Sequence, residues 1–259
     1  MLAALFWLSC SAAAEPLPYE VERGVVYGFQ ERQRGDLYRP RGEGPWPAVL
    51  VLHGGSWARG DRSRMNPYAE RFASEGYVVF NVDYRLAPEH PHPAQIEDVR
   101  AAFAWLRDRA GPLTIDTRRM AAMGYSAGGH LALLLGLQEA PGPRPAAVAS
   151  GAAPTDLLAY PRNPIVRSFL GQGPEHREHW VSASPLEHVS AGDPPVLLYH
   201  GKADSVVDIE HSRRLHSRLD ASGVTVRLIE RRFLGHMTGY VFDGAAMSAV
   251  LDFFAEQMP

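Results

Sequence analysis

The feature that most constrains the fold of this 259-residue chain is a regular alternation of apolar runs with helix-periodic segments. The apolar runs are continuous, as in "PAVLVLHGG" (47–55) and "YVVFNVDY" (77–84). Continuous apolar strands are buried on both faces, which is typical of a parallel sheet covered by helices on both sides. The sequence therefore predicts one α/β domain with a mostly parallel sheet.

The same alternation places the remaining elements. Further strands are expected from residue 119 to the G-Y-S turn, at 146–153, 195–201 and 225–232, and helices at 64–76, 93–111, 209–219 and 242–258. Residues 154–194 interrupt the pattern, because they are rich in Pro and His and show no clear strand. A segment of this length in a compact domain is usually functional, so we expect a small cap insertion there.

The first residues, "MLAALFWLSCSAAAEPLPYE", indicate a leader rather than part of the domain. An apolar stretch precedes small residues, and Ala12-Ala13-Ala14 fits the A-x-A pattern of a cleavage site. The stretch is too short to span a bilayer. We therefore expect a signal peptide at 1–14, a single mature domain at 15–259, and a secreted or periplasmic protein without a membrane span. A buried N-terminal helix is the alternative.

Charge and cysteine content exclude several classes of function. The formal net charge of −3 gives no reason to expect a nucleic-acid partner. Cys10 is the only cysteine and lies in the leader, so thiol catalysis, disulfides and cysteine metal sites are not expected in the mature domain. The histidine-rich runs 90–92 and 175–180 do not have a strong zinc-ligand spacing. We predict no metal and no cofactor.

Gly124-Tyr125-Ser126-Ala127-Gly128 is a G-x-S-x-G pattern at a point where a strand turns directly into a helix. That is the setting of a nucleophile elbow, which exposes the serine hydroxyl at the end of the strand. Side chains at 124 and 128 would collide with neighbouring elements, which explains both glycines. Ser126 is therefore the candidate nucleophile, and an N-cap serine at a glycine-rich helix start is the alternative.

A serine hydroxyl needs a histidine base, which in turn is oriented by a carboxylate. In this kind of fold the chain order is serine, acid, histidine, each after a strand. Three histidines follow the turn "HGKADSVVD" (200–208). His211 and His216 fall within a predicted helix and are expected on its surface. His236, in the glycine-punctuated loop "FLGHMTGY", is therefore the candidate base.

Two aspartates compete for the role of the acid. Asp208 immediately precedes a predicted helix, so it can act as the N-cap. Asp204 lies in the turn just past a strand end, where its carboxylate can reach across the tips of adjacent strands. We therefore favour Asp204 as the acid, with an ordinary turn aspartate as the alternative.

The run "HGGSW" (53–57) directly follows an expected strand. Consecutive glycines let the backbone approach a ligand and turn N–H groups towards it, so an oxyanion hole is expected here. The candidate donors are the N–H groups of Gly55, Ser56 and Ala127. Three further residues are candidates for lining the substrate pocket: Trp57, Tyr125 and Met237.

Together these motifs resemble the α/β-hydrolase esterases, specifically the hormone-sensitive-lipase-like and related carboxylesterase group. "HGGSW", "DYRLAPEHPHPAQIEDVRAAFAWL", "GYSAGGHLALLL" and "HGKADSVV" match that group in order and spacing. The resemblance covers roughly residues 25–257. It implies an α/β-hydrolase fold, a triad and an oxyanion hole on the residues already identified: Ser126, Asp204 and His236, and Gly55, Ser56 and Ala127.

Two departures from that group bear on the substrate. The third glycine of its HGGG motif is Ser56 here, and "HGG-x-W" is also the pattern of arylformamidases. The chain before His53 is too short for the N-terminal cap helices of hormone-sensitive-lipase-like esterases, so we expect a more open pocket covered mainly by 154–194.

The prediction is a serine carboxylesterase that hydrolyses short-chain or small acyl esters through an acyl-enzyme. Its partner would be a small-molecule ester, and acyl groups linked to carbohydrate are one natural target for an exported enzyme. An arylformamidase resembling kynurenine formamidase, with the same triad, is one alternative. A catalytically silent α/β-hydrolase acting as a binding module is another.

Overall fold

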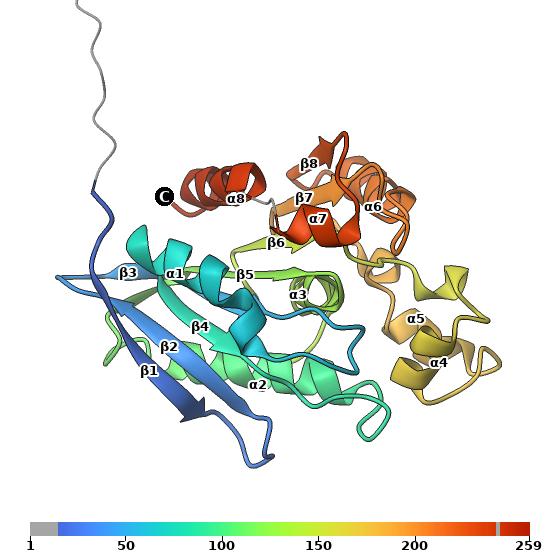
Figure 1. Ribbon diagram of the computed structural model, residues 1–259, viewed down its shortest axis with the longest axis horizontal. Helices are drawn as coiled ribbons and strands as arrows, with labels where there is room; N and C mark the ends of the chain where they lie inside the picture. The colour runs from blue at the N-terminus through green and yellow to red at the C-terminus, as the bar shows by residue number, and fades with distance from the viewer. Residues whose placement is uncertain (1–14, 242–243) are drawn as a thin grey trace, which may run out of the picture.

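The computed structural model describes residues 15–241 and 244–259, and in these ranges eight strands form one sheet (Figure 1). The strands are β1 (Tyr19–Val26), β2 (Arg34–Pro40), β3 (Trp46–Leu52), β4 (Val78–Val82), β5 (Ile115–Tyr125), β6 (Ala147–Gly151), β7 (Val196–Gly201) and β8 (Val226–Arg231). Their order across the sheet is β1-β2-β4-β3-β5-β6-β7-β8. The last six strands in this order, β4, β3, β5, β6, β7 and β8, pair in parallel. This confirms the predicted mostly parallel sheet.

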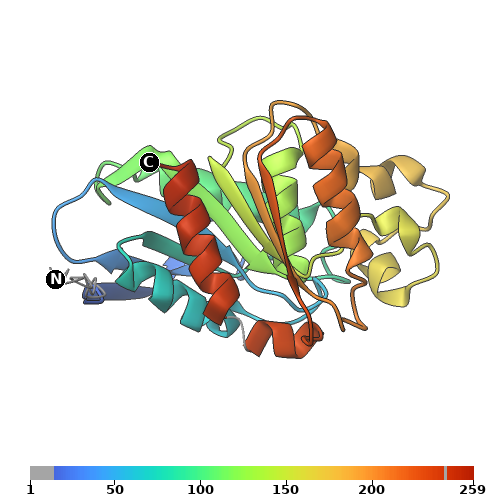
Figure 2. The same cartoon turned by 90° about the horizontal axis from the view of Figure 1, so that it is seen from above.

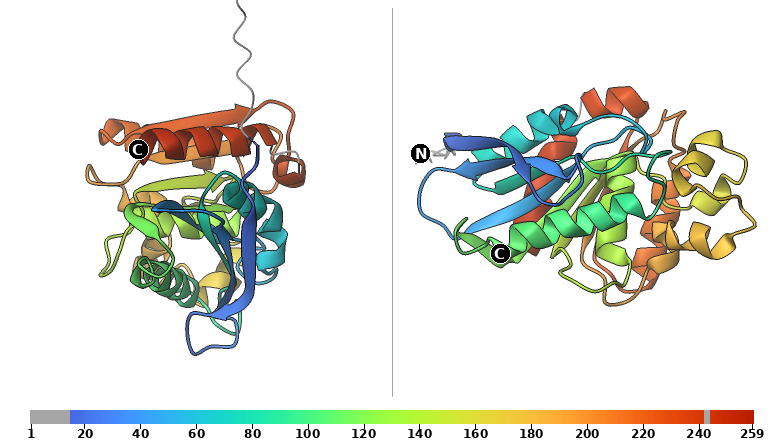
Figure 3. Two further views of the ribbon diagram at one scale, coloured as in Figure 1. Left: turned by 90° about the vertical axis from the view of Figure 1, so that its left-hand side faces the viewer. Right: turned by 90° about the horizontal axis from the view of Figure 1, so that it is seen from below.

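Helices cover both faces of the sheet (Figure 2, Figure 3). α1 (Asn66–Ser74) and α8 (Gly244–Gln257) pack on one face, and α2 (Ala94–Asp108), α3 (Ala127–Leu137) and α6 (Glu210–Ala221) pack on the other. α2 buries its predicted apolar stripe, which includes Ile96, Val99 and Phe103. α3 is buried along its whole length, since it consists of Ala, Gly and Leu apart from His130. The core therefore lies on both sides of the sheet.

The edge formed by β1 and β2 differs from the expected fold. β1 pairs antiparallel with β2, and β2 pairs antiparallel with β4. Neither strand is among the expected elements, because charged residues break the apolar pattern of "YEVERGVV" and "RGDLYRP". The expected signal peptide, residues 1–14, and the first two residues of the expected terminal helix lie outside the described residues.

Residues 154–194 contain no strand, as the sequence indicated, but they form short helices. These are η2 (Leu157–Ala159), α4 (Pro164–Leu170), α5 (Arg177–Ser182) and η3 (Pro185–His188). They lie at one end of the sheet, next to α3 and α6 (Figure 1). The segment is anchored by aromatic rings, because Trp180 is buried and Phe169 stacks on Trp57 with ring centroids 4.2 Å apart.

The parallel strands bring distant parts of the sequence to one edge of the sheet. The loops that follow β3, β5, β7 and β8 all leave from the carboxyl ends of their strands, where ligands bind in open α/β sheets. Two elements complete this edge: η1 (Arg62–Met65) after β3, and α7 (His236–Val241) after β8. No helix in the described ranges is long and apolar enough to cross a membrane.

Candidate active site

Ser126 lies at the junction of β5 and α3, with φ of 55° and ψ of −121°. A positive φ is unfavourable for a residue with a side chain, so the surrounding turn holds the serine in this conformation. A Cβ on Gly124 would collide with the backbone of Gly128, and a Cβ on Gly128 would collide with the carbonyl of Leu52. The prediction that both positions need glycine is confirmed.

His236 lies between Ser126 and Asp204. Its Nε2 is 3.0 Å from the Ser126 Oγ, and its Nδ1 is 2.7 Å from the Asp204 Oδ2. Because an ionised carboxylate can only accept, Nδ1 carries the proton and Nε2 is left to accept from the serine hydroxyl. The sequence indicated a loop at this histidine, but His236 is the first residue of α7. The Tyr125 hydroxyl donates to the His236 carbonyl at 2.6 Å and holds this helix start beside the serine.

The Asp204 side chain is fully buried and its two oxygens have different partners. Oδ1 accepts from the backbone N–H groups of Val206 and Val207, each at 2.9 Å, while Oδ2 faces His236. Burial acts to raise the pKa of this carboxyl, but hydrogen bonds from His200, His236 and Val207 outweigh it and hold the pKa well below its usual range. Asp204 is therefore ionised at neutral pH.

Asp208 has a separate, local role. Its Oδ1 accepts from the Glu210 N–H at 3.0 Å, and its carbonyl accepts from the His211 N–H at 3.1 Å, at the start of α6. A carboxylate in this position stabilises the first turn of a helix. The geometry thus separates the two aspartates as the sequence suggested, with Asp204 beside the histidine and Asp208 at the helix.

His200 is a further member of the site that sequence reasoning missed. It is buried at the end of β7, with Nε2 at 3.3 Å from the Asp204 Oδ2 and 3.0 Å from the Val207 carbonyl. Both neighbours accept, so Nε2 carries the proton, and Nδ1 accepts from the Ser212 hydroxyl at 2.7 Å. The available signal was a histidine within an otherwise apolar strand, "VLLYHG".

His211 corrects another expectation, because it is buried rather than on the helix surface. Its Nδ1 accepts from the backbone N–H groups of Thr155 and Asp156, at 3.2 and 3.3 Å, and its Nε2 lies 2.7 Å from the Tyr160 hydroxyl. α6 packs against the start of the 154–194 segment at this point, which the helical period alone does not reveal.

The loop after β3 has an unusual backbone. φ is positive at Gly55, Ser56 and Trp57, at 130°, 57° and 58°. A Cβ on Gly55 would collide with the Arg59 carbonyl, so only glycine fits that position. Within the described residues, no acceptor is found for the N–H groups of Gly55 and Ser56. Gly55 and Ser56 line a cavity together with Ser126.

A cavity of about 250 Å³ opens beside the serine. It is lined by Gly54, Gly55, Ser56, Arg59, Arg64, Tyr125, Ser126, His236, Met237 and Tyr240. Tyr125 and Met237 thus lie where the sequence suggested. Trp57 does not, because it is buried between Phe169 and His130, to which its indole N–H donates at 3.1 Å. None of the lining residues comes from 154–194, so the expected cover over this cavity is not formed by that segment.

In the described parts of the chain, no group of three or more His, Cys, Asp or Glu side chains is arranged to hold a metal ion. The chemistry that the observed geometry supports is proton transfer between serine, histidine and carboxylate.

One model of a known protein family matches most of this chain. The family model named BD-FAE matches residues 36–219, which span the region from β2 to α6. The chain belongs to the BD-FAE family. This match agrees with the resemblance to α/β-hydrolase esterases that the motifs indicated.

Relatives of this BD-FAE chain include proteins named as esterases. It is 32% identical over 253 residues to esterase LipC of Mycobacterium tuberculosis, covering 88% of this chain and 62% of LipC. The chain therefore spans less than two thirds of that relative's length. Among solved structures, a truncated carbohydrate esterase from gut microbiota has a TM-score of 0.83 at 25% identity, covering 95% of this chain and 98% of that one. An esterase of Thermogutta terrifontis, Est2, has a TM-score of 0.78 at 26% identity, covering 92% and 91%.

Proposed function

We propose that this protein is a serine carboxylesterase that hydrolyses short-chain or small acyl esters. The observation that carries the proposal is the hydrogen-bonded line of Ser126, His236 and Asp204, with distances of 3.0 and 2.7 Å. A histidine that accepts from a serine hydroxyl and donates to a carboxylate is the arrangement that activates serine as a nucleophile.

The proposed reaction has two halves. The Ser126 Oγ attacks the ester carbonyl, and His236 Nε2 takes the hydroxyl proton as a tetrahedral oxyanion forms. His236 then gives this proton to the leaving alkoxide, and the alcohol departs from an acyl-serine. Water attacks the acyl group, again losing a proton to His236, which returns it to Ser126 as the acid leaves. Asp204 stays ionised throughout and stabilises the imidazolium.

The proposed oxyanion hole consists of the N–H groups of Gly55, Ser56 and Ala127. Gly55 and Ser56 support it through their positive φ values and their N–H groups, which have no acceptor among the described residues. Ala127 is the first residue of α3, where N–H groups and the helix dipole favour negative charge. Each donor of this kind is worth about 3 kcal/mol of barrier.

Two observations support ester substrates with a small acyl group. The relatives LipC and Est2 and the gut carbohydrate esterase are named as esterases, and the cavity beside Ser126 is only about 250 Å³. Acyl groups carried by carbohydrate are the natural target that best fits these relatives. An arylformamidase with the same triad remains the rival enzyme. A silent binding module is disfavoured, since all three proposed triad side chains are present and connected.

The test is hydrolysis of p-nitrophenyl acetate, butyrate, octanoate and decanoate, beside N-formylkynurenine. We expect turnover to be fastest for the two shortest esters, and Ser126→Ala to lower kcat by roughly 10⁴-fold or more. Exclusive turnover of the formamide would favour the rival enzyme. Full activity of Ser126→Ala would exclude the mechanism.

Export is part of the proposal and rests on the leader described above. Expression of the full chain in a bacterial host, followed by cell fractionation, should give a periplasmic or secreted protein whose mass spectrum starts at Glu15. An unprocessed protein confined to the cytoplasm would contradict it.

A further inference from the structure

The cavity beside Ser126 is strongly basic for a chain whose formal net charge is −3. Arg59 and Arg64 are among its lining residues, and in the described parts of the chain none of the lining residues is Asp or Glu. Both arginines are exposed. A cleft lined by charge of one sign raises the local concentration of ligands of the opposite sign.

Both arginines extend from backbone that is held near the cavity, Arg59 by the proposed oxyanion loop and Arg64 by Tyr240. The Arg59 N–H donates to the Gly55 carbonyl at 3.1 Å, and the Arg59 Cγ lies 3.4 Å from the position that a Cβ on Gly55 would occupy. The Arg64 carbonyl accepts from the Tyr240 hydroxyl, and its Nε lies 3.3 Å from the position of a Cβ on Gly60. Their attachment points are therefore fixed relative to Ser126.

Neither guanidinium has an ion-pair or hydrogen-bond partner among the described residues. Arg62, which lies between them in the sequence, behaves differently: it pairs with Asp36 at 2.8 Å and with Asp83. The carboxyl of Asp61 also lies nearby, but it accepts from the Ser63 N–H at 2.9 Å and caps η1. Arg62 is thus structural, whereas the donors of Arg59 and Arg64 have no protein partner in the described ranges and can serve a ligand.

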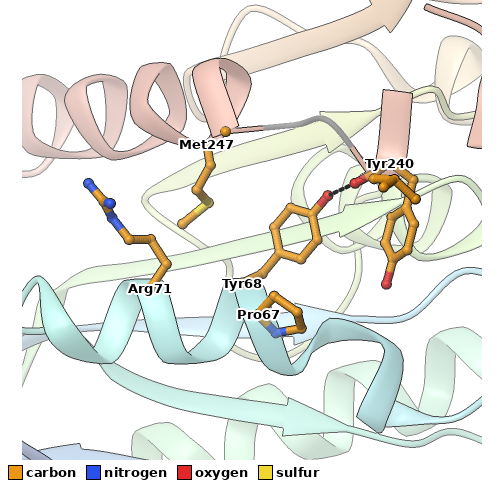
Figure 4. Close-up of a pocket in the computed structure, with 7 residues that line it drawn as sticks. Pro67, Tyr68, Arg71, Tyr240 and Met247 are labelled. Atoms are coloured by element: carbon orange, nitrogen blue, oxygen red, sulfur yellow. Dashed lines mark hydrogen bonds between the residues drawn. The ribbon is translucent and has the colours of Figure 1, made fainter. Parts of the chain in front are cut away.

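A neighbouring cavity shows the contrast. Tyr240 lines both cavities, and Figure 4 shows Tyr68, Tyr240 and Met247 around the second one. The Tyr68 hydroxyl donates to the Tyr240 carbonyl at 3.0 Å, and the one arginine that lines this cavity in the described residues, Arg71, is paired with Glu75 at 2.9 Å. Apolar groups suit that cavity, while the unpaired positive charge is confined to the one beside Ser126.

We propose that Arg59 and Arg64 select esters that carry a carboxylate close to the scissile bond. This inference rests on the proposed esterase function and specifies its substrate class. An arginine fork binds a carboxylate through two parallel hydrogen bonds, which gives both affinity and orientation. Two forks beside one nucleophile anchor the charged end of the substrate while the ester carbonyl lies at Ser126.

Two matched substrate pairs test the proposal. 4-Acetoxybenzoate and its neutral methyl ester place the carboxylate on the alcohol side, and the p-nitrophenyl monoester of adipate and p-nitrophenyl hexanoate place it on the acyl side. At low salt we expect kcat/KM to favour the charged member of at least one pair by about tenfold. The preference should fall as salt is raised, because exposed charges are screened.

The variants separate this inference from the proposed function. Arg59→Gln/Arg64→Gln should bring the charged-to-neutral ratio close to one, whereas Arg118→Gln should leave it unchanged, since Arg118 is exposed near the other end of β5. A ratio at or below one in the native protein for both pairs, or a preference that survives in the double variant, would overturn the inference alone. Absence of turnover for all four esters would overturn the proposed function together with it.

Discussion

Two regions of the molecule use histidine side chains in opposite ways. At the edge beside Ser126, His236 and His200 both direct a protonated nitrogen at the Asp204 carboxylate. Where residues 154–194 pack on the domain, His130 and His211 instead direct an unprotonated Nδ1 at N–H donors.

The difference decides what a second proton does in each region. At the edge, an imidazolium is stabilised by a buried carboxylate. In the packing region, a proton on the His130 Nδ1 would face the Trp57 N–H, and its Nε2 is already committed to the Ala183 carbonyl at 2.7 Å. Burial lowers the pKa of His130 and of His211 to about 4. The geometry of the first region supports proton transfer, whereas the second region favours neutral histidines.

Removing the negative charge of Asp204 should have the largest effect. Asp204→Asn is expected to lower kcat by roughly 10³- to 10⁴-fold, because the amide cannot stabilise the imidazolium and favours the wrong tautomer. Asp208→Asn is the matched control and should change kcat less than about threefold, since Asn caps a helix as well as Asp. Ester hydrolysis by the two variants checks this. A larger loss in Asp208→Asn would reverse the assignment.

His200 should contribute less, as a positioning residue behind the acid. His200→Phe is expected to lower kcat by about tenfold with little change in KM, because Asp204 loses one of its side-chain donors. His200→Gln is the matched control, since its side-chain amide keeps a donor, and it should retain more of the native kcat. Equal losses of kcat in the two variants would show that His200 acts through packing alone.

The packing region should make the protein sensitive to acid. The unfolded chain takes up protons on His130 and His211 below about pH 6.5, whereas the folded chain does not until about pH 4. The free energy of unfolding should therefore fall across this window, by about 3 kcal/mol for each histidine at its lower end. Asp204 adds to the loss only at lower pH, since its folded pKa is depressed from an already low value.

Urea unfolding followed by tryptophan fluorescence measures this dependence. His130→Gln keeps one donor and one acceptor but cannot titrate, so it should be less stable at neutral pH and lose less stability between pH 6.5 and 4. An unaltered slope in this variant would show that His130 does not hold the segment in the neutral form.

The smallest expected effects separate the cavity from the packing region. Trp57→Phe should lower the free energy of unfolding by about 1–2 kcal/mol, because it leaves the His130 Nδ1 without a donor, and should barely change kcat/KM. Met237→Ala should do the reverse: the side chain is exposed at the cavity, so KM changes while stability does not. If Trp57→Phe instead changed kcat/KM and left stability unchanged, Trp57 would belong to the substrate pocket.

Sequence reasoning reached the parallel core and the chain order of the site, because both leave local signals. Continuous apolar runs mark buried strands, and the glycines at 124 and 128 mark the turn around Ser126. The antiparallel edge of β1 and β2 was not predicted. A half-exposed edge strand tolerates charged residues, and these mask the alternation of apolar and polar residues that marks a strand.

The environment of individual side chains was harder to predict than the elements that carry them. His211 and Trp57 have polar or aromatic partners from the 154–194 segment, which lies far away in the sequence. His200 and Asp204 meet because the chain turns back on itself after β7. The contacts of His211 and Trp57 depend on tertiary packing, and that of His200 depends on the shape of a turn, so a single sequence carries no periodic signal for any of them.

The hydrogen bond between Ser126 and His236 joins residues 110 positions apart. During synthesis the nucleophile's turn can form once α3 has packed, but its base is delivered only when β8 and α7 have been added to the far side of the sheet. Ester hydrolysis would therefore report that the last third of the chain has docked. A partly synthesised chain would be inert until that moment.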